Sequence, residues 1–152
     1  MPGGAVISRG GANSAMSRHV VAAVRDLPAG ARKALTVNGR PIVVFNVHGA
    51  FYGLLDRCPH QGANLSKGII GGLAHGEEPG KIRYLRPGEF LRCPWHGWEF
   101  DIRTGQSWCD PDRVRTRIFR VEVASGDKVV KGPYVAETFP VTVEDDYVVI
   151  EV

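Results

Sequence analysis

Two short segments of the chain combine a cysteine with a histidine at close spacing. Residues 58–60 read CPH, and residues 93–96 read CPWH. A thiolate and an imidazole separated by one or two residues can point at one metal centre. Since each segment supplies one ligand of each kind, the pair could place two thiolates on one iron and two imidazoles on another. The spacing therefore predicts that four residues bind a [2Fe–2S] cluster: Cys58, His60, Cys93 and His96.

Glycines and tryptophans around these segments suit a cluster site. Glycine permits tight turns whose backbone N–H groups could approach the bridging sulfides. The turn glycines expected here are Gly62, Gly68 and Gly97. Trp95 and Trp98 are large apolar side chains, and we expect them to cover the cysteine-bound iron and exclude water from it.

A structural zinc site is the alternative interpretation, because it also uses two cysteines and two histidines. Its usual spacing keeps like ligands together, as C-x₂₋₄-C followed by H-x₃₋₅-H. Here each half is mixed, which favours the cluster. A zinc-bound interaction module, which would be colourless, stays open at this stage.

The two segments resemble the cluster boxes of Rieske ferredoxins and of the Rieske domain of ring-hydroxylating oxygenases. The resemblance lies in CPHQGANLSKG and CPWHGWEFDIRTG and covers about residues 19–125. It implies an all-β fold with a cluster-binding subdomain, histidines near the surface, and one-electron transfer. One departure is the gap of 32 residues between His60 and Cys93, about twice the common length. The excess coincides with the polar stretch 74–88, which we expect to be a surface excursion.

The elements expected from the sequence are short strands separated by Gly, Pro and Asn turns, and Asn38-Gly39 is a strong hairpin signal. No segment of ten or more residues keeps a helical apolar period. The fold class predicted is an all-β, Rieske-like antiparallel sandwich or barrel with a cluster-binding subdomain at about 57–101. The strands expected are 20–24, 34–37, 41–47, 51–55, 90–92, 98–102, 117–123, 140–143 and 147–152.

The ends of the chain lie outside the two boxes. Residues 1–17 are rich in Gly, Ala and Ser, and we interpret them as a disordered leader before a single domain at 18–152. The alternative is an over-extended start, with the true beginning at Met16. The stretch 128–152 is expected to return a closing strand pair to the base sheet, with Asp145-Asp146 near the turn. Gly132-Pro133 could instead form a loop beside the cluster, as a proline-containing loop does in some Rieske proteins.

The composition narrows the class of protein. The 152 residues carry a formal charge of +3, without the dense basic patch typical of nucleic-acid binding. No apolar run approaches the roughly 18–20 residues of a membrane span. Three cysteines cannot form a disulfide framework and weakly favour a reducing compartment. We therefore expect a soluble cytoplasmic protein without nucleic-acid or membrane partners.

The family resemblance also bears on redox potential. High-potential Rieske proteins carry an extra, disulfide-bonded cysteine in each box, and a serine and a tyrosine that donate hydrogen bonds to the cluster. The matching positions here hold Ala63, Trp95, Trp98 and Phe100. Lost donors destabilise the reduced cluster, so we expect a potential at the low end of the Rieske range, on the order of −150 mV.

The predicted role is a ferredoxin that takes electrons from a flavin-dependent reductase and passes them to a terminal oxygenase. The alternative is a Rieske subunit of a larger oxidoreductase, as in nitrite reductases. Oxygenase subunits carry a second iron on two histidines and one carboxylate. The remaining histidines, His19, His48 and His75, form no D-x₂-H-x₄-H-like arrangement, so we expect no catalytic mononuclear iron site.

Other notable residues have ordinary interpretations. We expect Cys109 to be a packed cysteine, His48 a turn residue and His75 part of a solvated loop. Core positions are expected for Phe51, Tyr52 and Trp108. Between Arg57 and Arg120 there are eleven Lys/Arg and seven Asp/Glu, which fits either a solvated surface or a docking face for an acidic partner. The arginines in question include Arg83, Arg86, Arg92, Arg113, Arg115 and Arg117.

Overall fold

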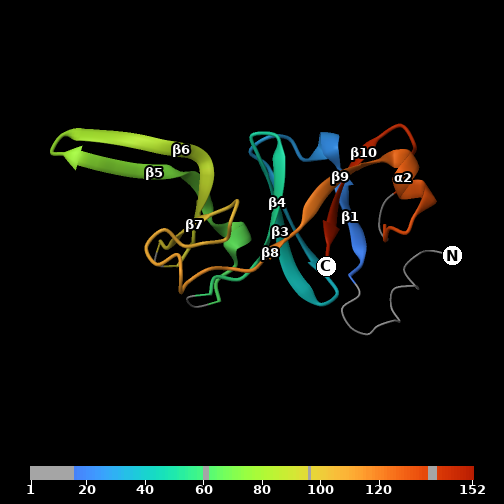
Figure 1. Cartoon of the computed structure of the whole chain (residues 1–152), viewed down its shortest axis with the longest axis horizontal. Coiled ribbons are helices and arrows are strands. Elements are labelled where there is room, and N and C mark those ends of the chain that lie inside the picture. The colour runs from blue at the N-terminus through green and yellow to red at the C-terminus, as the bar shows by residue number, and fades with distance from the viewer. Residues whose placement is uncertain (1–15, 60–61, 96, 137–139) are drawn as a thin grey trace.

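The computed structural model describes residues 16–59, 62–95, 97–136 and 140–152 (Figure 1). The predicted all-β class is confirmed, because three antiparallel sheets make up most of this part of the chain. The predicted leader falls almost entirely on residues 1–15, which lie outside the described residues. Among the described residues, no helix is long and apolar enough to cross a membrane.

Two of the sheets form the base of the molecule. The first has the order β1-β10-β9 and the second the order β2-β3-β4-β8. The strands of the first are β1 (Arg18–Ala23), β10 (Asp146–Glu151) and β9 (Val121–Ser125). The strands of the second are β2 (Arg32–Val37), β3 (Arg40–Val47), β4 (Ala50–Leu55) and β8 (Ile118–Phe119). Asn38 and Gly39 have φ of 51° and 78° in the β2–β3 hairpin, as the sequence predicts.

Strand β3 connects the base to the rest of the molecule, because side chains on both of its faces are buried. Ile42 and Val44 point into the core between the two base sheets. Val43, Phe45 and Val47 point into a second core on the opposite face. This division follows from the alternation of side chains along a strand. The same strand therefore supports two separate packing layers.

The third sheet has the order β5-β6-β7 and lies beyond the second core. Its strands are β5 (Ile69–Glu78), β6 (Lys81–Arg92) and β7 (Glu99–Asp101). Short helical turns complete the fold: η2 (Val24–Asp26), η3 (Leu65–Lys67) and α2 (Gly126–Lys131). Figure 1 shows α2 at one end of the molecule and the β5–β6 hairpin at the other.

The hairpin of β5 and β6 extends away from the rest of the molecule as a two-stranded arm (Figure 1). The register pairs Gly71 with Phe90 but Leu73 with Leu85, so four residues of β6 lie opposite Gly72 alone. A Cβ at Gly72 would lie 2.4 Å from the Leu85 carbonyl oxygen, so the bulge requires glycine there. The stretch 74–88 is thus a surface excursion as expected, but it is built from strands that the sequence did not reveal.

The C-terminal region differs from expectation in two ways. Residues 140–143 form no strand, and β10 alone joins the base sheet instead of a closing strand pair. Gly132-Pro133 does not form a loop beside the cluster loops, because the chain just after it lies against β1. There the Val20 N–H donates to the Val135 carbonyl at 2.8 Å, and the Val135 N–H donates to the Arg18 carbonyl at 2.8 Å.

Candidate metal centre

The two predicted ligand segments fold into loops with the same backbone closure. The Cys58 N–H donates to the Ala63 carbonyl at 2.7 Å, and the Cys93 N–H donates to the Trp98 carbonyl at 2.7 Å. Each loop therefore closes between a cysteine and the residue five positions later. Gly62 and Gly97, the fifth residues of the two loops, have φ of 82° and 69°. Both turns require this left-handed conformation, which glycine adopts without strain.

Gly68 has a different role from the tight turn that we expected. Its φ of −77° and ψ of 176° are extended backbone that any residue adopts. A Cβ there would lie 2.3 Å from the Arg92 carbonyl oxygen. Glycine is therefore required at this position because β6 passes close by, just before the second loop begins. The close approach brings the ends of the two loops together.

The loops bring the thiols of Cys58 and Cys93 together in the second core. Both side chains are buried, and they share this core with Leu65, Leu91 and Phe100. Burial raises the pKa of the Cys93 thiol, the Trp95 backbone N–H lowers it, and the neighbouring Cys58 thiol raises it further. Two adjacent buried thiols are suitable donors to a soft metal ion, which displaces their protons on binding.

The two predicted histidine ligands, His60 and His96, lie outside the described residues. Among the residues that the structure describes, no His, Asp or Glu joins the two cysteines to form a group of three metal ligands. His60 follows Cys58 by two positions, and His96 follows Cys93 by three. The four-residue ligand set therefore stays a prediction, of which the structure brings together the two cysteines.

Asp56 positions the first loop, and the sequence analysis did not identify it. Its carboxylate accepts hydrogen bonds from the Ser66 backbone N–H at 2.6 Å and from the Ser66 hydroxyl at 2.7 Å. Its own N–H donates to the Pro41 carbonyl at 2.8 Å. Asp56 is buried and lies two positions before Cys58. Its hydrogen bonds connect η3 to the end of β4. An aspartate next to an arginine gives no sequence signal for such a role.

The aromatic and sulfur side chains near the loops correct several predictions. Trp98 packs against the second core as expected, whereas Trp95 is 52% exposed and does not act as a cover. Trp108 is 56% exposed, so the prediction that it is a core residue was wrong. Its ring and the ring of the buried Phe90 form a T-shaped contact, with centroids 5.9 Å apart. Cys109 is exposed rather than packed.

The remaining aromatic predictions concern Phe51 and Tyr52. Both are partly buried, and each packs against a different core: Phe51 against the core between the base sheets and Tyr52 against the core that holds the cysteines. They therefore border the core as expected without being fully enclosed. This arrangement again reflects the alternation of side chains along β4.

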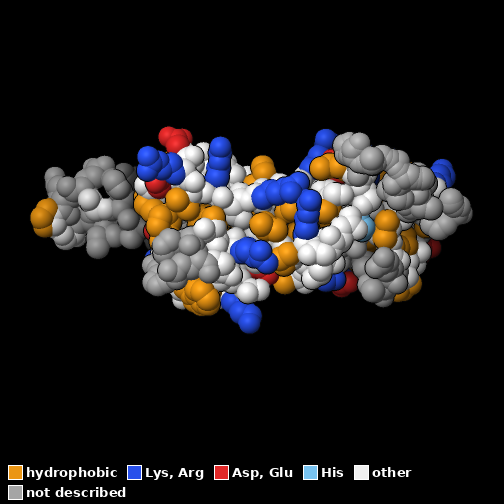
Figure 2. Space-filling model, turned by 90° about the horizontal axis from the view of Figure 1, so that it is seen from below, with side chains coloured by type: hydrophobic (Ala, Val, Ile, Leu, Met, Phe, Trp, Pro, Cys, Tyr) orange, Lys and Arg blue, Asp and Glu red, His pale blue; other side chains and the backbone are white. Residues whose placement is uncertain are grey.

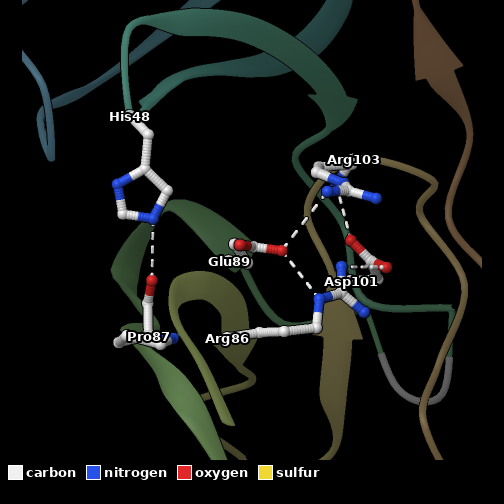
Figure 3. Close-up of polar contacts among 6 residues, drawn as sticks. All are labelled: His48, Arg86, Pro87, Glu89, Asp101 and Arg103. Carbon is white, nitrogen blue, oxygen red and sulfur yellow. Dashed lines mark hydrogen bonds and ion pairs between the residues drawn. The ribbon is translucent and has the colours of Figure 1, made fainter.

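A network of charged residues joins the bulge of β6 to β7 (Figure 3). Arg86 donates to Glu89 at 2.7 Å and to Asp101 at 2.8 Å. Arg103 lies 3.4 Å from the same Glu89 carboxylate. Burial lowers the pKa of Arg86, but hydrogen bonds to Asp101 and Glu89 raise it more, so the net shift is upward. We call the two loops, together with β7 and the ends of β5 and β6 next to them (Ile69–Gly71 and Phe90–Arg92), the metal-centre subdomain. The network fixes where the arm leaves it.

His48 and His75 have structural positions in this region. His48 is a turn residue as predicted, with φ of 53°, and its Nε2 lies 2.9 Å from the Pro87 carbonyl oxygen (Figure 3). This contact joins the β3–β4 turn to the bulge. His75 belongs to β5, where it pairs with Arg83 in the register, so the expectation of a loop was wrong.

Comparison with known proteins agrees with this geometry. The family model of the Rieske [2Fe–2S] domain matches residues 17–120. The chain belongs to the Rieske [2Fe–2S] family. This membership assigns a [2Fe–2S] cluster to the chain and makes a zinc-bound module the wrong interpretation.

Relatives of this Rieske protein place it among electron carriers. The ferredoxin subunit of 3-phenylpropionate/cinnamic acid dioxygenase from Escherichia coli K12 is 31% identical over 119 residues, which cover 78% of this chain and 96% of the relative. The corresponding subunit of Shigella boydii is 30% identical over the same length. The chain is thus a Rieske electron carrier related to the ferredoxin subunits of aromatic dioxygenases.

Solved structures show the same fold. A chain from the complex of reduced oxygenase and oxidized ferredoxin in carbazole 1,9a-dioxygenase is 26% identical, with a TM-score of 0.54, over 86% of this chain and 91% of that one. The nitrite reductase small subunit of Mycobacterium tuberculosis, described as putative and NADH-dependent, has a TM-score of 0.59 at 16% identity and covers 91% of this chain and 97% of that one. The second likeness is one of fold alone.

Proposed function

We propose that this Rieske protein passes single electrons from a flavin-dependent reductase to a terminal oxygenase in an aromatic-ring dioxygenase system. Its relatives are named as ferredoxin subunits of such dioxygenases. A structural relative comes from a complex of oxygenase and ferredoxin. A cytoplasmic location is part of the same proposal and is supported by the thiol content of the chain.

The proposed ligands of the cluster are Cys58 and Cys93 on one iron, and His60 and His96 on the other. The observation that carries this assignment is the meeting of the two buried thiols at the start of two loops with equivalent closure. In each loop the histidine lies between the cysteine and the left-handed glycine. When bound, a Rieske cluster supplies reversible one-electron chemistry.

The residues of the chain would hold and insulate this group. The apolar side chains of the second core surround the cysteines and exclude water from them. In the first loop His60 follows Pro59, and in the second loop His96 precedes Gly97. Pro59 and Gly97 are both exposed. We therefore propose that the cysteines face the interior and that electrons leave through the histidine side, which docks with partners.

An EPR-monitored redox titration of anaerobically purified protein tests the proposal, with iron, sulfide and zinc quantified on the same sample. We expect a rhombic Rieske signal and about two irons per chain. The variants Cys58→Ser and Cys93→Ser should lose the signal. Cys109→Ser is the matched control, because Cys109 is exposed and lies outside both loops, and it should keep the signal unchanged.

The histidine assignment has its own test. His60→Ala and His96→Ala should each lose or change the rhombic signal, whereas His48→Ala should leave it intact because the ring of His48 lies in the β3–β4 turn and its nitrogen lies against the Pro87 carbonyl, away from both loops in the sequence. A normal signal in either loop variant would show that the assigned ligand set is wrong. Zinc in place of iron in the wild-type protein would contradict the electron-transfer function itself.

A further inference from the structure

Three arginines lie close together in the sequence after the second loop, between β7 and β8. Arg113 ends a turn, in which its N–H donates to the Asp110 carbonyl at 3.2 Å, and the other two follow on extended chain. Arg113, Arg115 and Arg117 are exposed, while the residues between them, Val114 and Thr116, point inward. The alternation along the extended chain places the side chains of Arg115 and Arg117 on one side of it, directly after Arg113 at the end of the turn. In Figure 1 this segment runs along the lower side of the molecule, from the metal-centre subdomain to the base. We call these three residues the arginine stripe.

The arginine stripe lies next to the metal centre. Val114, between two of its arginines, packs against the core that contains Cys58 and Cys93. The Thr116 hydroxyl donates to the Leu55 carbonyl at 3.2 Å, three positions before Cys58. The segment is therefore attached to the start of the first loop. Charges on it act at short range on whatever docks beside the cluster, since the Debye length is about 8 Å at physiological salt.

The arginines of the stripe form no ion pair within the described part of the chain, although Asp110 and Asp112 precede them in the sequence. No carboxylate in the described part of the chain forms an ion pair with its arginines, whereas Arg86 and Arg92 each pair with acidic side chains. The ring of Phe119 holds Arg117 through a cation–π contact at 4.9 Å, which leaves the charge available. Figure 2 shows Lys and Arg side chains grouped over the middle of the lower face, with few acidic side chains among them.

We propose that the arginine stripe is a docking face for an acidic surface on the flavin-bearing electron donor. The inference rests on the proposed function. Among the arginines noted in the sequence, Arg86 and Arg92 serve internal ion pairs, and this separates them from the three arginines of the stripe. An array of like charges without internal partners attracts a surface of opposite sign and raises the rate of association.

The donor, rather than the acceptor, is the partner that this sign of charge favours. The oxidised protein carries one positive charge more than the reduced protein. Its attraction to an acidic surface is therefore stronger before it accepts an electron than after. An acidic donor would bind the oxidised form and release the reduced form, whereas an acidic acceptor would bind the reduced form less well. The basic stripe thus favours binding of the partner that reduces the cluster over binding of the partner that oxidises it.

Stopped-flow reduction of the oxidised holoprotein tests the proposal, with the fully reduced form of an acidic flavodoxin as the probe. The flavin loses one electron and the Rieske protein gains it. The variant Arg113→Gln/Arg115→Gln removes two charges of the stripe and leaves the contact of Arg117 with Phe119 intact. The control Lys128→Gln/Lys131→Gln removes two exposed charges from α2, whose Val129 packs into a different core at the base.

We expect the stripe variant to be reduced about three- to tenfold more slowly than wild type at low ionic strength, with a weaker dependence on salt. The control variant and the charge-retaining variant Arg113→Lys/Arg115→Lys should react at close to the wild-type rate. Equal slowing of the stripe and control variants would overturn the proposal, because it would show that the rate of reduction depends only on the net charge of the protein. No slowing of the stripe variant would also overturn it.

Oxidation of the reduced holoprotein by an acidic plastocyanin distinguishes donor from acceptor. We expect the stripe variant to lose less rate in this reaction than in its reduction by flavodoxin. A larger loss with plastocyanin would overturn the assignment to the donor. An EPR spectrum of a dithionite-reduced portion of each sample reports cluster content, so that failure of the proposed function is recognised separately from failure of the docking face.

Discussion

Phe100 lies in the same buried core as Cys58 and Cys93, and its ring carries no hydrogen-bond donor. Ala63, which closes the first loop, is also buried and without a hydroxyl group. Donors to the cluster sulfurs stabilise the additional negative charge of the reduced state and raise the potential. At the residue scale, the side chains around the cysteines thus favour a low potential.

The variant Phe100→Tyr tests this argument by adding one hydroxyl group. We expect the midpoint potential of the wild-type protein at the low end of the Rieske range, on the order of −150 mV, and an upward shift of tens of millivolts in the variant. The measurement is an EPR-monitored titration. Phe119→Tyr is the control, because Phe119 belongs to the core between the base sheets, and its potential should match wild type. A clearly positive wild-type potential would contradict the argument.

At the scale of elements, Arg86 holds the bulge of β6 against β7 through two carboxylates, both of which are mostly shielded from water. We expect Arg86→Met to lower the free energy of unfolding by about 1–2 kcal/mol, because Asp101 loses its ion pair and Glu89 keeps only the longer contact with Arg103. The measurements are urea unfolding and hydrogen exchange of the arm. Exchange should become faster for the amides of 73–85.

Arg103→Met is the matched control for this prediction. Arg103 contacts the same Glu89 carboxylate, but at 3.4 Å and from a more exposed position. Its loss should change the free energy of unfolding by less than about 1 kcal/mol. If the two variants lose equal stability, the bridge from β6 to β7 is not what holds the bulge.

The sequence predicted the base strands because their side chains alternate toward two cores, as in β3, where one face meets each core. The arm left no such signal. Its paired strands contact chiefly each other, and its residues AHGEEPGKIRYLRPG are polar with glycine and proline at both the turn and the bulge. These residues carry no period-2 pattern of apolar side chains to recognise. Residues 140–143 (PVTV) alternate like a strand but form none.

For the candidate site, too, some features could be predicted from the sequence and others could not. Residue type and spacing were sufficient to predict that Cys58 and Cys93 lie together and that Gly62 and Gly97 form tight turns, because left-handed turns restrict the residues allowed. The ligand set itself stays a prediction. The exposure of Trp108 and Cys109 could not be predicted from type, since both residues are usually buried. The role of Asp56 depends on a hydrogen bond across ten residues, which only the folded chain defines.

At the scale of the whole molecule, the arm accounts for the unusual distance between the two ligand loops. Within the metal-centre subdomain, β5 pairs with β6 from Ile69 to Gly71, opposite Arg92 to Phe90. The same residues of β6 pair with β7 on their other side. Beyond the bulge, the arm from Leu73 to Leu85 pairs with itself. The arm therefore lengthens the chain between the loops without changing how the loops meet.

Shortening the arm tests this independence. Leu73 and Leu85 are direct partners in the register, so replacing residues 74–84 by Asn-Gly would close the hairpin with a two-residue turn. We expect the shortened protein to keep its full iron content and its rhombic EPR signal. Its free energy of unfolding should remain within about 1 kcal/mol of wild type, because the pairing that supports the loops is untouched.

The control for the shortened arm is a disturbance at the bulge itself. Gly72→Ala places a Cβ against the Leu85 carbonyl, at the point where the arm joins the metal-centre subdomain. We expect this single methyl group to cost more stability than removal of the entire arm, since the backbone must move to accept it. Loss of the cluster in the shortened protein, with the signal retained in Gly72→Ala, would show instead that the arm itself supports the metal centre.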